Sequence, residues 1–142
     1  MTVNEIAGLL ATTADTVRYY TRLGLVTPSK SSNGYKFYSD TDQSRLRFIL
    51  SARQLGFSVN DIQQILKEAD HGKSACPLVR KLIKTRLAET EKQFQQMLQL
   101  REKMQRALKQ WERMTDKAPT SHMVCHLIEN IDNQSDEEAQ NG

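Results

Sequence analysis

The chain has 142 residues, of which 38% are hydrophobic and 26% charged, with a formal net charge of +3. No apolar run reaches about 18 residues and no basic start precedes an apolar stretch, so neither a membrane span nor a secretory signal is expected, and the protein is predicted to be cytoplasmic. The mean hydropathy of −0.62 favours a small head with an elongated helix over one deep core.

The N-terminal segment predicts two short helices joined by a turn. Thr2 and Glu5 have the spacing of a capping box, and the apolar residues that follow predict a helix to about Leu10. A second helix is predicted to start at residue 12 or 13 and to end at Gly24, because apolar residues recur at helical spacing between them. Two short helices with such a join are typical of a helix-turn-helix.

A small wing and two further helices are expected next. Asn33-Gly34 is a strong hairpin-turn signal, so the segment "SKSSNGYKFYS" predicts two short strands. A third helix is predicted from Ser39 or Asp40 to about residue 55. A fourth is predicted from Ser58, with Asp61 at the capping-box position.

A long helix is expected after residue 72. Pro77 is favoured in a first helical turn, which makes Cys76 the predicted N-cap, and no Gly or Pro occurs between residues 78 and 118. Most heptad a and d positions between residues 83 and 111 are apolar, which predicts a dimerising coiled coil. Residues 73–114 carry 11 basic and 4 acidic side chains, a balance that suits either a polyanion or a solvated coiled-coil flank.

The last part of the chain is predicted to form a loop and a short helix. Ala118-Pro119 is expected to end the long helix, and residues 121–131 indicate a loop that turns into a short amphipathic helix. Residues 132–142 are polar and acidic, which favours a disordered tail.

Aromatic and basic residues gather on the predicted second helix and on the wing. Arg18, Tyr19 and Tyr20 are consecutive, so they fan out around one helical turn and cannot all lie in a core. Arginine and tyrosine donate to phosphate oxygens, and Tyr35, Lys36 and Tyr38 repeat this chemistry on the wing. Any single tyrosine is more often a packing residue, but the two clusters together predict DNA contact.

The runs "VNEIAGLLATTADTVRYYTRLGLVTP", "NGYKFYS" and "RLRFILSARQLGFSVNDIQQIL" together resemble the MerR family of bacterial transcription regulators. The resemblance implies a mainly α fold, with a winged helix-turn-helix head at 1–72 and an antiparallel coiled-coil dimerisation helix at 73–114. An effector loop with a short helix would follow at 115–131. It also implies a homodimer that distorts double-stranded promoter DNA with effector bound, so that RNA polymerase engages both promoter elements. The DNA contacts implied are Arg18, Tyr20, Tyr35, Lys36, Tyr38 and Arg53, with Thr13 and Thr16 as further recognition-helix contacts.

The same resemblance points to a metal effector. Cys76 and Cys125 match cysteines of the family's divalent-metal branch, in which the first position serves the other subunit's loop. A further loop cysteine that the family usually has is missing here, since that region reads Thr115-Asp116-Lys117-Ala118. His122 and His126 flank Cys125 and complete a set of thiolates and imidazoles that suits a divalent ion such as zinc or cadmium, with lead as a related candidate. Asp116 is a possible oxygen ligand.

Other functions remain open at this point. The two thiols also suit a regulator that senses electrophiles or oxidants through Cys76 or Cys125. A purely structural coiled-coil dimer is a second alternative, and it would not bind duplex DNA in a salt-dependent way. No nucleophile motif, acid–base pair or phosphate-binding glycine loop occurs, so the chain is not expected to be an enzyme.

Overall fold

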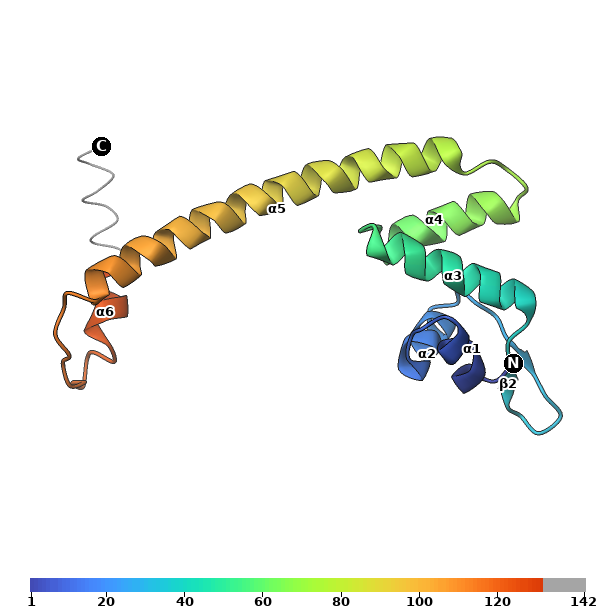
Figure 1. The fold of residues 1–142 in the computed structure, drawn as a ribbon, viewed down its shortest axis with the longest axis horizontal. Helices are drawn as coiled ribbons and strands as arrows, with labels where there is room; N and C mark the ends of the chain where they lie inside the picture. The colour runs from blue at the N-terminus through green and yellow to red at the C-terminus, as the bar shows by residue number, and fades with distance from the viewer. Residues whose placement is uncertain (132–142) are drawn as a thin grey trace. The chain divides into compact units, whose positions relative to one another are not determined.

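The computed structural model describes residues 1–131, and it is mainly helical (Figure 1). The predicted acidic tail at 132–142 lies outside the described residues. Contacts divide the chain into a compact unit Met1–Glu89 and a second unit that begins at Thr90. Within residues 1–131, no helix is both long enough and apolar enough to cross a bilayer.

The first two helices form the predicted helix-turn-helix. α1 spans Val3–Leu9 and α2 spans Ala14–Arg22, and the two pack against each other (Figure 1). Thr2 caps α1 by accepting a hydrogen bond from the Glu5 amide, and Thr13 caps α2 in the same way. These caps satisfy backbone N–H groups that a helix start leaves without partners.

The wing is a two-stranded antiparallel hairpin. β1 (Ser29–Lys30) pairs with β2 (Lys36–Phe37), with Ser29 opposite Phe37 and Lys30 opposite Lys36. Gly34 has a φ of +81°, a conformation that favours glycine, and its amide donates to the Ser31 carbonyl at 2.9 Å. The hairpin predicted from Asn33-Gly34 is confirmed.

Two capped helices complete the head. α3 spans Asp40–Gln54 and α4 spans Val59–Asp70, and each begins with a closed capping box. Ser58 and Asp61 form the box of α4, as the sequence predicted. The largest fully buried side chains of this unit come from the four helices α1 to α4 and from the segments that join them: Ile6, Val17, Val26, Tyr38, Leu46, Ile49 and Ile62.

The long helix begins one residue earlier than predicted. α5 spans Cys76–Trp111, so Cys76 lies inside the first turn and is not the N-cap. The helix also ends at Trp111, before Ala118-Pro119, where the sequence placed its end. The Val79 amide donates to the Ala75 carbonyl at 2.8 Å, which places Ala75 at the position before the helix. Leu78, Val79, Leu82 and Ile83 of α5 pack against the core of the head. The first unit therefore extends beyond residue 72, where the sequence placed the end of the head.

The second unit holds the end of α5, a loop and the short helix α6 (His126–Glu129). Thr120 and Met123 form an isolated antiparallel bridge in the loop. The Trp111 indole N–H donates to the Leu127 carbonyl at 3.1 Å, which ties the start of the loop to α6. The loop and short helix predicted for residues 121–131 are confirmed.

Candidate DNA-binding surface and metal loop

Helix α2 presents Arg18 and Tyr19 to solvent. Arg18 forms a surface ion pair with Asp15 at 3.0 Å, and its side chain remains 48% exposed. Such an exposed pair contributes little to stability, so its guanidinium can exchange Asp15 for a phosphate at low cost. Tyr19 is 44% exposed. The hydroxyls of Thr13 and Thr16 hydrogen-bond each other at 2.8 Å at the start of this helix.

Two of the predicted contact residues lie in the core instead. Tyr20 is 6% exposed and Tyr38 is 1% exposed. The Tyr38 hydroxyl lies 2.8 Å from the Thr21 hydroxyl, and Thr21 donates its own hydrogen to the Val17 carbonyl. Tyr38 is therefore the donor in its bond to Thr21. The sequence predicted that both tyrosines contact DNA, but their burial assigns both to the core of the head, Tyr20 from α2 itself and Tyr38 from the residue after β2.

The wing carries an exposed basic and aromatic pair. Tyr35 is 75% exposed, and Lys36 lies on the exposed strand β2. Lys30, which the sequence analysis missed, lies directly opposite Lys36 in the hairpin. Like charges that face each other across a strand pair repel, and a bound polyanion relieves that repulsion. The sequence could have predicted this pairing, because a hairpin turn at Asn33-Gly34 brings the strands that contain Lys30 and Lys36 face to face.

Arg53 lies in the last turn of α3 and is exposed. One of its terminal nitrogens donates to the Phe57 carbonyl at 2.9 Å. That bond orients the guanidinium while other N–H groups remain able to donate to a phosphate.

Cys76 borders an open pocket between α3, α4 and the start of α5. Its thiol is free and exposed, and the pocket has a volume of about 610 Å³. Apolar side chains such as Phe48, Ile65 and Val79 form much of the lining. An accessible thiol beside an apolar hollow can bind a soft metal ion or react with an apolar electrophile.

Cys125 immediately precedes α6 and is half-buried. Its amide donates to one Glu129 carboxylate oxygen at 2.7 Å, and the Val124 amide approaches the other at 3.3 Å. Glu129 therefore fixes the backbone at Cys125, a role that the sequence analysis missed. Its place four residues after Cys125, in the first turn of a helix, is the signal that could have indicated it.

The two histidines beside Cys125 differ in their surroundings. His126 is 5% exposed, and its Nε2 donates to the Thr115 carbonyl at 2.9 Å. Only its Nδ1 then retains a lone pair for a metal. His122 is exposed. Across residues 1–131, no three His, Cys, Asp or Glu side chains gather in a group that could hold a metal ion.

A winged helix-turn-helix with arginine, lysine and tyrosine on its second helix and wing, followed by a long helix, defines a class of DNA-binding transcription regulators. Residues 1–69 match the family "MerR HTH family regulatory protein", and residues 43–107 match "MerR, DNA binding". The chain belongs to the MerR family.

Known relatives are regulators, and they include a probable heavy metal-dependent transcriptional regulator of Haemophilus influenzae and a mercuric resistance operon regulatory protein of Bacillus cereus. The chain is 34% identical over 101 residues to the transcriptional regulator HmrR of Rhizobium leguminosarum bv. viciae, covering 71% of this chain and 78% of HmrR. It is 28% identical over 132 residues to ZntR of Escherichia coli K12, covering 92% of this chain and 91% of ZntR. The lead(II) complex of PbrR691 from Ralstonia metallidurans CH34 shares the fold, with a TM-score of 0.71, 22% identity, and coverage of 92% and 98%. These relatives are transcription regulators and not enzymes, which confirms that expectation.

Proposed function

We propose that this protein is a homodimeric, effector-dependent activator that acts on promoter DNA and responds to a divalent thiophilic metal ion in the cytosol. The observation that carries the DNA-binding part is the joint exposure of Arg18 and Tyr19 on α2 and of Tyr35 and Lys36 on the wing. Helix α2 would enter a major groove while the wing contacts the flanking phosphates. Arg53, anchored on Phe57, would add a further phosphate contact.

The apolar stripe of α5 supports a dimer. Apolar side chains of this helix that are between 44% and 67% exposed in the single chain are Leu87, Phe94, Met97, Leu100, Met104 and Leu108. A second copy of α5, packed antiparallel, would remove this stripe from water. Two heads held by paired helices would meet successive grooves of one duplex, and such a dimer would realign promoter elements for RNA polymerase.

The metal site proposed here is shared between subunits. One chain supplies Cys125 with His122 and the second nitrogen of His126, which is too few strong donors for a closed tetrahedral site. Cys76 of the partner subunit would add a second thiolate. A thiophilic cation bound by both thiolates would tie the loop of one subunit to the opening turn of the other subunit's α5. Glu129 would hold the Cys125 backbone in place for this step.

Metal titration of the reduced protein tests this site. We expect Zn(II), Cd(II) or Pb(II) to bind stoichiometrically and to produce thiolate charge-transfer absorption for Cd(II) and Pb(II). Cys125→Ser should abolish that absorption while leaving affinity for DNA within about twofold, because Cys125 lies outside the DNA-contacting head. Stoichiometric binding that is unchanged in Cys125→Ser would remove the loop from the site.

A thiol-reactive effector is the second candidate, and the place of Cys76 favours it. The exposed thiol borders a largely apolar pocket, where an apolar electrophile would collect before it reacted. Mass spectrometry after exposure to an apolar enal distinguishes the two. Rapid modification of Cys76 that changes DNA-dependent transcription, with no stoichiometric metal uptake, would replace the metal proposal.

A further inference from the structure

A buried ion pair joins α5 to the start of α4 within the first compact unit. The Arg86 Nε lies 3.1 Å from Asp61 Oδ2, with the Asp61 side chain 4% exposed and that of Arg86 26% exposed. A terminal nitrogen of Arg86 also pairs with Glu89 at 2.6 Å. Removing one partner of a buried pair leaves the other charge without compensation, so loss of the Arg86 cation is expected to disturb Asp61 at the start of α4.

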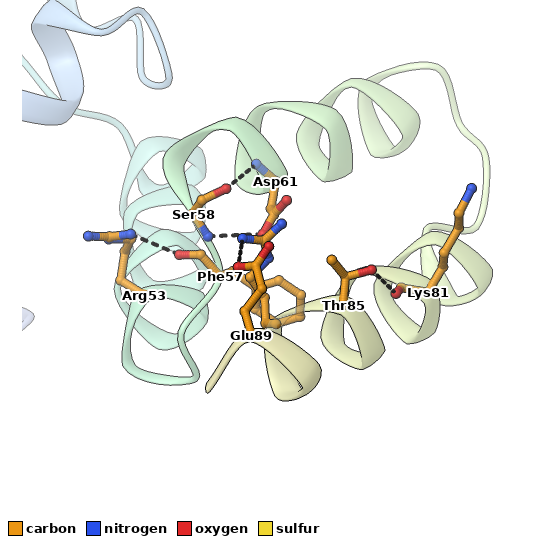
Figure 2. Close-up of polar contacts among 8 residues, drawn as sticks. Arg53, Phe57, Ser58, Asp61, Lys81, Thr85 and Glu89 are labelled. Atoms are coloured by element: carbon orange, nitrogen blue, oxygen red, sulfur yellow. Dashed lines mark hydrogen bonds and ion pairs between the residues drawn. The ribbon is translucent and has the colours of Figure 1, made fainter. Parts of the chain in front are cut away.

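The same carboxylate closes the cap of α4. Asp61 Oδ2 accepts a hydrogen bond from the Ser58 amide at 3.0 Å, and the Ser58 hydroxyl accepts one from the Asp61 amide (Figure 2). One oxygen of Asp61 therefore serves both the helix cap and the ion pair to α5. A displacement of Arg86 would therefore act on an oxygen that also closes the cap of α4.

The cap leads directly to a residue of the DNA-binding surface. Phe57, the residue before Ser58, is buried, and its carbonyl accepts the hydrogen bond from Arg53 (Figure 2). Polar contacts and one peptide bond thus form a continuous chain from α5 to the guanidinium that we assign to a phosphate. The chain runs through Arg86, Asp61, Ser58, Phe57 and Arg53.

We propose that Arg86 and Asp61 couple the direction of the dimerisation helix α5 to the contact between Arg53 and a DNA phosphate. A change in the direction of α5 pulls on Asp61, shifts the 57–58 segment, and reorients the Arg53 guanidinium on the DNA backbone. Arg86 and Asp61 are positioning residues, since neither meets the DNA. The inference rests on the proposed function, because it requires that the head binds DNA and that α5 moves in response to an effector.

A double-mutant cycle on DNA binding tests the coupling. The probe is a duplex selected by the wild-type protein from a random pool, and affinities are measured for Arg53→Ala, Arg86→Gln and both together. If the residues act independently, the two fold-losses multiply in the double variant. We expect the fold-loss of affinity in the double variant to be smaller than that product by a factor of about three or more. Such a difference exceeds the ordinary error of additivity. Multiplying losses would overturn the coupling.

Matched variants separate this role from a loss of stability. Glu89→Gln removes a neighbouring charge but leaves the contact between Arg86 and Asp61, so its fold-loss of DNA affinity should multiply with that of Arg53→Ala. If Glu89→Gln were non-additive with Arg53→Ala as well, the path through Asp61 would be overturned. Arg86→Lys keeps a cation near Asp61 and should recover part of the affinity. If Arg86→Gln does not fold, Asp61→Asn replaces it, because the amide oxygen still accepts from Ser58. Wild-type protein that selects no duplex overturns the proposed function itself.

Discussion

Tyr38 separates a packing role from a DNA contact, because one hydroxyl can be removed without changing the shape of the ring. In the structure this hydroxyl is buried and donates to Thr21, which in turn donates to the Val17 carbonyl. In Tyr38→Phe, Thr21 still has its own acceptor, so no buried donor is left without a partner. We therefore expect a loss of about 1 kcal/mol in the free energy of unfolding, the usual net value of one hydrogen bond.

Replacement of the whole Tyr38 side chain should lower the free energy of unfolding much more than removal of its hydroxyl. Tyr38→Ala removes a fully buried ring and should cost about 3–5 kcal/mol, the range for aromatic-to-alanine changes in cores. Both values are read from urea unfolding at one fixed protein concentration, because dimer stability depends on concentration.

DNA affinity provides the decisive comparison. Tyr38→Phe should bind the selected duplex within about twofold of the wild type, whereas Tyr35→Phe, on the exposed wing, is the matched control that should weaken binding. A hydrogen bond to a charged group is worth about 1.5–3 kcal/mol, or a tenfold loss and more. If Tyr38→Phe lost affinity on that scale while its stability held, the hydroxyl would contact DNA and its assignment to the core would be wrong.

Three further outcomes follow from the structure. Arg45 lowers the pKa of Asp70 below its ordinary value of 3.8 through a side-chain hydrogen bond, so Asp70→Asn should be less stable than the wild type at neutral pH. That difference in stability should vanish as the pH falls below 3.8, where the Asp70 carboxylate becomes protonated. A difference that is independent of pH would contradict the pairing. Gly34→Ala should lose about 1 kcal/mol in urea unfolding because φ is +81° with open space around the added methyl, whereas Gly8→Ala in α1 should not lose stability; equal effects would argue against the turn geometry. Met97→Lys should shift the protein towards monomer in sedimentation equilibrium, and an unchanged dimer would exclude this stripe.

Local signals in the sequence predicted the head well. The caps at Thr13, Ser39 and Ser58 depend on residues three positions apart, so the sequence alone contains the whole interaction. The wing likewise follows from the turn chemistry around Gly34. Each of these elements lies where the sequence placed it.

Side-chain burial and long-range contacts were harder to predict. Tyr20 lies three residues after Val17 on the buried face of α2, a spacing that could have assigned it to the core before the structure was known. Tyr38 offers no such pattern, because its burial depends on Thr21, which is distant in sequence. The pair of Asp61 and Arg86 also joins separate helices, and no local spacing predicts which basic residue of α5 meets α4.

Run-off transcription with purified RNA polymerase tests the central claim most directly. The template carries the selected duplex between its two promoter elements, and reactions contain either EDTA or one of Zn(II), Cd(II) and Pb(II). The account predicts more transcript with a divalent metal for the wild-type protein and no increase for Cys125→Ser. Transcript levels that are the same with EDTA and with every metal would contradict it.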